Sequence, residues 1–325
     1  MSFYLKTTTL GAVLFAAMAV APASLAQESL EIRNFVGSIN WSNGPLSVEI
    51  EKNAGDTKIK GSKSVTIDGG ISDIDGKDCK SAYGRYDFDF FGKNRKGHFG
   101  GYKGLDNLPI LKITLPEETK LILRDSIIFT EGTPNVGELD VEMSYCGEIT
   151  LGDVTDTVAV DSRGSADITF GNSGQIVAYL KGSGDLTGGD SSDVLIKSNG
   201  SADVKLGQIK SLEITMNGSG DTQLGSVGSG LSYSGHGSGD FEVDSVEGAY
   251  LELSSHGSGD IDIHGGRVGK LTVSVHGSAD VEFDGKAETA NLRTSGSGDV
   301  FVERVTGSVE IKTSGSGDVE VDKRS

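Results

Sequence analysis

The stretch HGSGDIDIHGG, residues 256–266, joins a glycine-rich phrase to a short alternating segment. Twenty residues earlier the chain has HGSGDFEVD, and twenty residues later it has HGSADVEFD. The phrase Gly-Ser-(Gly or Ala)-Asp occurs nine times, beginning at Gly164, Gly182, Gly200, Gly218, Gly237, Gly257, Gly277, Gly296 and Gly315. Successive copies lie 18 to 20 residues apart. A period this narrow is typical of a repeat architecture.

Each copy is followed by residues that alternate between apolar and polar, such as Ile261-Asp262-Ile263. A polar or Gly-containing break comes next, and then a second alternating run such as residues 271–275. Alternation predicts a strand with one buried face. An apolar period of 3.6 is nowhere long enough for a helix, so the pattern predicts an all-β chain.

A unit of about 19 residues cannot bury its own apolar face, but it can when copies stack on one another. The repeats at residues 158–322 therefore predict a single-stranded parallel β-solenoid, in which each strand pairs with its equivalent about 4.8 Å away in the next coil. We place the phrase at a corner. Gly permits the backbone angles of a tight corner, and Ser and Asp side chains can bond nearby backbone amides.

Weaker repeats extend the predicted solenoid upstream to one domain of residues 27–325. SYCGEITLG (residues 144–152) and LRDSIIF (residues 123–129) fit two earlier coils, and LPILKITLPEETKLIL before them predicts two strands. Alternation also occurs from residue 29 onward. Residues 70–108 break the pattern with aromatic, basic and Gly residues, which predicts an inserted loop or a cap over the first coils.

Residues 1–26 predict a signal peptide. Lys6 precedes an apolar run at residues 10–21, and Ser24 and Ala26 are small residues that fit cleavage before Gln27. No later segment is apolar enough to cross a membrane. We therefore expect an exported protein in the periplasm or on the outside of a bacterial cell. A formal net charge of −18 argues against nucleic acid as a partner.

Two cysteines, Cys79 and Cys146, remain in the chain after the predicted signal peptide. A pair of cysteines in an oxidising compartment is more often a disulfide than a metal or catalytic site. We expect a disulfide that ties the inserted loop to an early coil.

The nine Asp residues of the phrase should stack in one column. They are Asp167, Asp185, Asp203, Asp221, Asp240, Asp260, Asp280, Asp299 and Asp318. Carboxylates about 4.8 Å apart repel one another, so the column needs compensation. Backbone N–H groups of the corner are one source. Ca²⁺ is the other, since it prefers oxygen ligands, and the candidates are Asp240, Asp260 and Asp280.

The residue before each phrase forms a second column, which contains His236, His256 and His276. Three stacked imidazoles can bind a transition metal, or they can be a solvent-facing ladder whose members repel when protonated. Both interpretations stay open at this point.

We find no catalytic motif. No Ser elbow, phosphate loop or HExxH occurs, and the carboxylates belong to every coil rather than to one site. A carbohydrate-active β-helix enzyme is the alternative. It would need the basic residues of the insertion, Arg85, Lys93, Arg95, Lys96 and His98.

The signal peptide, the acidic chain and the repeated GSGD or GSAD phrases together resemble the putative autotransporter adhesin family with the head GIN domain, over about residues 29–322. The resemblance implies a bacterial β-solenoid and supplies no catalytic residue. We expect a non-catalytic, adhesin-like or envelope-associated protein that binds a glycan or protein. No helix or Pro covers the last strand, residues 319–321, which predicts end-to-end self-association.

Overall fold

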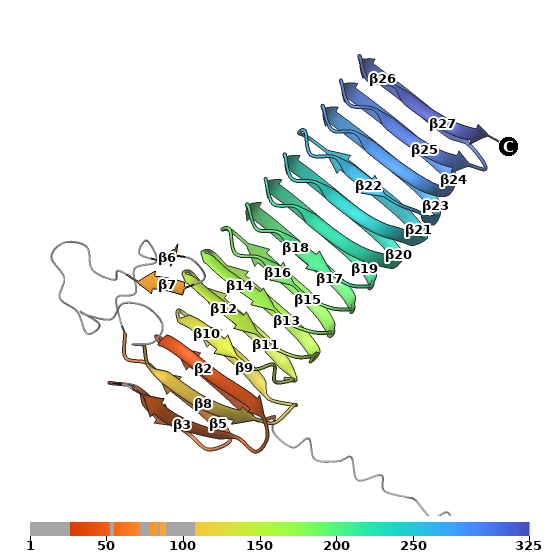
Figure 1. The fold of residues 1–325 in the computed structure, drawn as a ribbon. Helices are drawn as coiled ribbons and strands as arrows, with labels where there is room; N and C mark the ends of the chain where they lie inside the picture. The colour runs from red at the N-terminus through yellow and green to blue at the C-terminus, as the bar shows by residue number, and fades with distance from the viewer. Residues whose placement is uncertain (1–26, 53–54, 72–78, 83–84, 89–107, 325) are drawn as a thin grey trace, which may run out of the picture.

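The computed structural model describes residues 27–52, 55–71, 79–82, 85–88 and 108–324. These residues form a parallel β-solenoid of about 11 turns with coils of about 19 residues (Figure 1). None of the described residues is helical, so the described part has no helix that could cross a membrane. The predicted fold class is confirmed.

Each coil has two faces, which we name the short face and the long face after their strands in the coils that contain the phrase; the first coils do not keep this difference in length. The short face is the strand that follows the phrase, and it is formed by β8 (Ile110–Leu115), β2 (Val36–Asn43), β10 (Ile127–Glu131), β12 (Cys146–Thr150), β14 (Ser165–Thr169), β16 (Leu186–Thr187), β18 (Val204–Leu206), β22 (Ile261–Ile263), β25 (Val300–Val305) and β27 (Val319–Arg324). The long face precedes the next phrase, and it is formed by β5 (Ser64–Asp68), β1 (Ser29–Arg33), β9 (Lys120–Arg124), β11 (Glu138–Met143), β13 (Val154–Ser162), β15 (Ser173–Leu180), β17 (Ser191–Gly200), β19 (Ile209–Gly218), β23 (Gly266–Gly277) and β26 (Val309–Gly315). Three long strands contribute to both faces: β20 (Thr222–Gly237), β21 (Phe241–Ser255) and β24 (Val281–Gly296).

The core consists of apolar columns between the two faces. On the short face the register aligns Phe241, Ile261, Val281 and Val300, all buried. On the long face it aligns Leu253, Val273 and Leu292. Burying one such side chain contributes about 1.5–3 kcal/mol. The stacked columns therefore hold coil on coil, as the alternation predicted.

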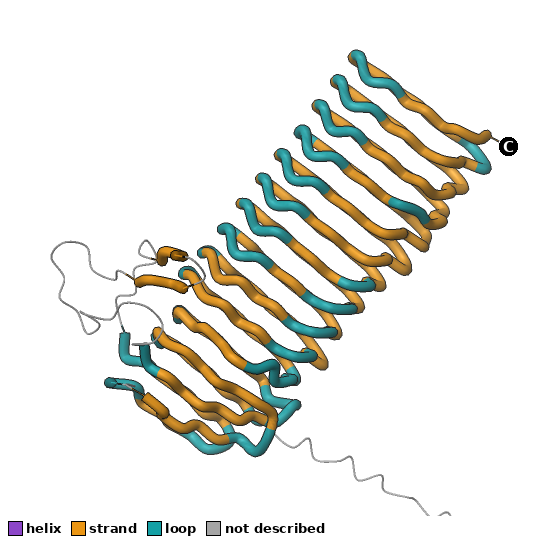
Figure 2. The backbone as a smooth tube through the Cα atoms, viewed as in Figure 1, coloured by secondary structure: helices purple, strands orange, loops and turns teal. Residues whose placement is uncertain are grey.

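The phrase lies at the corner that enters the short face, where the chain leaves the strand conformation (Figure 2). Its backbone also pairs between coils, since the N–H of Ser238 donates to the carbonyl of Gly218 at 2.9 Å. The predicted role for Asp is confirmed below, but the prediction for Ser was wrong. The Ser hydroxyls of the phrase make no hydrogen bond among the described residues, because their backbone amides are already paired and their side chains face solvent.

The first coils do not follow chain order. Strand β1 lies between β5 and β9, and β2 lies between β8 and β10. The chain therefore starts in an inner layer, builds the outer layer with β5 and β8, and then returns past the first layer (Figure 1). Two antiparallel strands, β3 (Ser47–Lys52) and β4 (Lys58–Lys60), pair with β8 and β5 and cover this end.

The predicted insertion falls between β5 and β8. Of it, the structure describes β6 (Cys79–Ala82) and β7 (Arg85–Phe88), which form an antiparallel pair. Residues 72–78, 83–84 and 89–107 lie outside the described residues, as does the predicted signal peptide.

Candidate functional site

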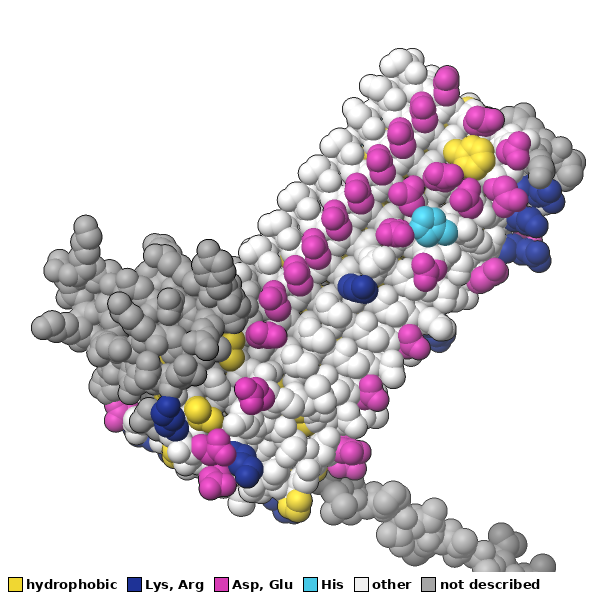
Figure 3. Space-filling view, viewed as in Figure 1, with side chains coloured by type: hydrophobic (Ala, Val, Ile, Leu, Met, Phe, Trp, Pro, Cys, Tyr) yellow, Lys and Arg dark blue, Asp and Glu magenta, His cyan; other side chains and the backbone are white. Residues whose placement is uncertain are grey.

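The Asp residues of the phrase form a continuous ladder along the solenoid. Each carboxylate accepts a hydrogen bond from the backbone N–H of the Asp one coil later, as between Asp260 Oδ1 and the Asp280 N–H at 2.8 Å. Eight such bonds, of 2.8–3.0 Å, connect Asp167 to Asp318. Figure 3 shows a regular line of acidic side chains along the molecule. The compensation comes from backbone amides, as expected for such a corner.

The ladder also concerns the predicted metal sites. Among the residues the structure describes, no group of three or more His, Cys, Asp or Glu side chains is placed to hold a metal ion. Asp240, Asp260 and Asp280 each use one carboxylate oxygen for the neighbouring amide. Calcium binding by this column stays a prediction, tested below.

A second ladder lies at the opposite corner and was not predicted. Here Asn and Asp alternate: the N–H of Asp153 donates to Asn135 Oδ1, that of Asn172 to Asp153, and that of Asp190 to Asn172, at 2.7–2.9 Å. The ladder continues at both ends, to Asn43 and to Gln208. The signal was available in the sequence as an Asn or Asp at intervals of 18 or 19 residues from position 135 to position 190.

The two ladders together show which side-chain atom makes the hydrogen bond between coils. Asn and Asp make the same contact at the second corner, so the side-chain oxygen is sufficient and the charge is not required. At the phrase corner burial raises the pKa of Asp185, and its neighbours Asp167 and Asp203 raise it further, against the opposing hydrogen bond from the Asp203 amide. This carboxylate is held in place although its charge is disfavoured.

The first Gly of the phrase is required by the spacing of the coils. A β-carbon at Gly257 would overlap the carbonyl oxygen of Gly237 in the preceding coil, and one at Gly277 would overlap that of Gly257. Gly277 also has a φ of +142°, which side chains rarely adopt. The corner backbones therefore pack directly on one another.

The predicted His column is a stack of parallel rings. His256 lies 4.7 Å from His236 and 4.7 Å from His276, with interplanar angles of 5° and 1°. Partial burial lowers the pKa of His256, and the charges of its two neighbours lower it further. Zinc ligands lie about 2.0–2.1 Å from the metal, so parallel rings this far apart would have to tilt to share one ion.

The short face adds a group of acids beside the Asp ladder. Glu242, Asp262 and Glu282 align in register. The Asp284 charge raises the pKa of Glu282, and burial raises that of Asp262. His264 contacts Glu242 at 2.9 Å, and this hydrogen bond raises the His264 pKa.

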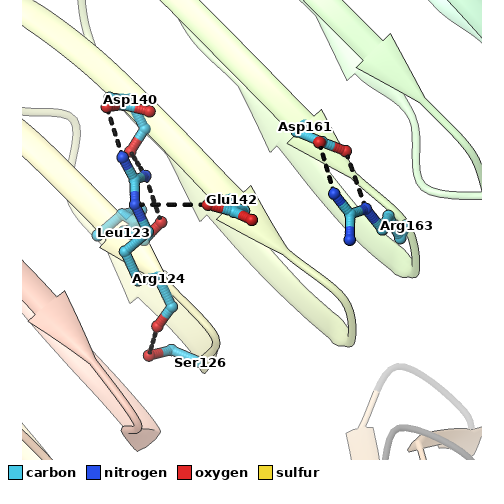
Figure 4. A network of polar contacts seen from close by, with 7 residues as sticks. All are labelled: Leu123, Arg124, Ser126, Asp140, Glu142, Asp161 and Arg163. Carbon is cyan, nitrogen blue, oxygen red and sulfur yellow. Dashed lines mark hydrogen bonds and ion pairs between the residues drawn. The ribbon is translucent and has the colours of Figure 1, made fainter.

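The early coils carry ion pairs instead (Figure 4). Arg124 of β9 contacts Asp140 and Glu142 of β11 at 2.5 and 3.8 Å. Arg163 bonds Asp161 through two nitrogens, at 2.9 and 3.3 Å, and this lowers the pKa of Asp161. These Arg side chains are therefore used within the fold.

Two other predictions fall partly outside the described part. Cys146 is buried at the start of β12, but nothing is described of the Cys79 side chain, so their pairing stays a prediction. The basic residues of the enzyme hypothesis lie there too: Lys93, Arg95, Lys96 and His98 are outside the described residues, and only the backbone of Arg85 is described.

Comparison with known proteins identifies the family. No curated protein matches this sequence. The crystal structure of a putative lipid binding protein from Parabacteroides distasonis is 15% identical, with a match that covers 90% of this chain and 92% of that one at a TM-score of 0.27. The family model described as "Putative auto-transporter adhesin, head GIN domain" matches residues 94–226 and 231–324. The chain belongs to this family.

Proposed function

We propose that this protein is an exported, non-catalytic, adhesin-like β-solenoid that binds a component of a bacterial cell envelope or its surroundings. One observation carries the proposal. Among the described residues, the acidic side chains of the phrase belong to a ladder that repeats coil after coil through eight Asp–amide bonds. A catalytic site usually interrupts a repeat, whereas an extended regular surface suits a long ligand.

The test is a binding panel with the chain from Gln27 onward. Peptidoglycan, purified envelope polysaccharides and envelope proteins are immobilised, and saturable binding to at least one of them is expected. The same polysaccharides are assayed for cleavage. Cleavage that disappears when residues 70–108 are replaced by a short linker would establish the enzyme alternative and overturn the proposal.

Self-association through the last coil is part of the proposal. Among the described strands, β26 pairs with β24 alone, and β27 pairs with β25 alone. Val309, Ile311, Val319 and Val321 are only partly buried, whereas their equivalents one coil earlier are buried. The opposite end is already covered by β3 and β4. A second copy that pairs with β26 and β27 would bury these four apolar side chains and the unpaired backbone groups of the two strands.

Light scattering tests this association. The chain from Gln27 should have a mass above that of one copy, and removal of residues 315–325 should lower it. An unchanged mass would remove the idea.

A further inference from the structure

Four of the eight basic residues that follow residue 266 are aligned in one column. From residue 211 to residue 266 the chain has no Lys or Arg. Arg267, Lys286 and Arg304 then occupy equivalent positions in three successive coils, and the register continues to Lys323. In Figure 3 Lys and Arg side chains gather near the C-terminal end of the molecule.

The column is not explained by ion pairs within the fold. Arg33, Lys120, Arg124, Arg163 and Lys312 each contact a carboxylate. Among the described residues, none does so for Arg267, Lys286 or Arg304, although Glu247 lies one coil before Arg267 and Glu303 precedes Arg304. Equivalent positions in adjacent coils are about 4.8 Å apart, so these cations repel one another. An external polyanion would relieve this repulsion.

An exposed aromatic ring and a hollow lie a few residues further along the coils than the column. Tyr250 is 43% exposed, and it precedes Lys270 and Thr289 in register. Gly230 leaves room for its ring, because a β-carbon there would lie 2.5 Å from Tyr250 Cε1. Lys270, Thr289, Asn291, Ser308 and Glu310 line a shallow hollow of about 340 Å³.

The polar groups of this region are incompletely satisfied. Asn291 Oδ1 and Arg304 Nε are two of the five buried side-chain polar atoms without a hydrogen-bond partner in the described part of the chain. In the hollow, Thr289 donates to Gly269 and Asn291 donates to Glu310, whereas the exposed Ser308 hydroxyl can exchange hydrogen bonds with a sugar hydroxyl. The flat face of Tyr250 offers apolar surface on which a sugar ring can pack.

We propose that this surface binds a linear acidic polysaccharide, with Arg267, Lys286 and Arg304 on its carboxylates and Tyr250 against a sugar ring. The inference rests on the proposed binding function and names its ligand class. A thin chain with repeated charges fits a single line of cations. A membrane or duplex nucleic acid would also face the acidic remainder of the molecule, since the whole sequence has a formal net charge of −18.

The experiment measures binding of polygalacturonate to the chain from Gln27 by calorimetry at several salt concentrations. Saturable binding is expected, and R267Q/K286Q/R304Q should weaken it at least tenfold and make it less salt-dependent. The matched control is K181Q/K197Q/K205Q, which removes three exposed cations of other coils and should change affinity less than twofold. Y250A should weaken binding, whereas Y179A, at an equally exposed Tyr, should not.

Circular dichroism first establishes that every variant is folded. Equal loss in both triple variants would overturn the proposal, because net charge alone would then explain binding. Stronger binding of oligo-deoxythymidylate or of phosphatidylglycerol vesicles would overturn it in favour of another anion. If the chain binds an envelope component but not polygalacturonate, this inference fails and the binding function stands. If it binds neither, both fail.

Discussion

Asp260 stabilises the corner through an oxygen atom rather than through its charge. Its Oδ1 accepts the Asp280 amide, and Asn residues make the same contact at the opposite corner. The first prediction therefore compares D260N with D260A. The free energy of unfolding of D260N should lie within about 0.5 kcal/mol of the parent value. That of D260A should be about 1 kcal/mol lower, because the Asp280 amide loses its hydrogen-bond acceptor. Thermal unfolding measures both.

The same melts test the calcium hypothesis. If backbone amides provide the compensation, the melting temperature should be equal in EDTA and in added Ca²⁺. A large rise with Ca²⁺ that D260N abolishes would instead assign the column to metal, since a ligand of the folded state stabilises it by mass action.

Gly257 illustrates a purely steric requirement. A β-carbon there would overlap the backbone of the preceding coil, whereas one at Gly265 would have its nearest neighbour at 3.8 Å. We expect G257A to destabilise the protein by about 3 kcal/mol and G265A to change the free energy of unfolding by less than about 1 kcal/mol. Urea unfolding compares them. Similar losses in both variants would contradict the steric explanation, because Gly265 has no overlapping neighbour and Ala alone would restrict the unfolded chain and favour folding.

The period of 18 to 20 residues determined which strands and columns could be predicted from the sequence. Nine copies of one phrase revealed the strands, the corner and the Asp column. The second ladder was missed because it mixes Asn with Asp and has no fixed neighbours. The layer order of β1 and β2 was missed because alternation shows that a segment is a strand but not which strand it pairs with. The cation column emerged only from the register, since Arg267, Lys286 and Arg304 are separated by 19 and 18 residues in unlike surroundings.

The stack of His236, His256 and His276 makes the stability of the folded state depend on pH. The pKa of His256 is lowered in the folded state, first by burial and then by its neighbours. The unfolded chain therefore binds a proton more readily, so this contribution to stability is present above pH of about 6.5 and decreases as the pH falls below it. The effect should be small because the ring is largely exposed.

H256N isolates this contribution. Asn already occupies this column in earlier coils, where Asn217 donates to Asn199 at 2.9 Å, so the substitution keeps a polar side chain of a kind that the column accepts. We expect the melting temperature of the parent to decrease more than that of H256N between pH 7.5 and pH 5.0. H264N is the control of opposite sign, because the Glu242 hydrogen bond raises the His264 pKa and stabilises the protonated form. A parent and an H256N variant with the same pH dependence would contradict the account.

For the whole molecule, layer order determines which coils are most sensitive to change. In a solenoid each coil contacts only its neighbours, so an inner layer loses two interfaces when it unfolds and a terminal coil loses one. In this protein the first strand of the described chain, β1, belongs to an inner layer. Strand β1 is held between β5 and β9, and Leu30 and Ile32 are fully buried.

I32A and I311A test this arrangement with the same chemical change. The I32A substitution should lower the free energy of unfolding by about 2–5 kcal/mol, because the shorter side chain leaves a cavity between two layers. Ile311 belongs to β26, where it is only partly buried, so I311A should lower the free energy of unfolding by less than about 1 kcal/mol. Hydrogen exchange locates the effect: I32A should increase exchange in β5 and β8, whereas I311A should affect only β26 and β27. If I32A lowered the free energy of unfolding by no more than I311A does, β1 would not lie inside the stack in solution.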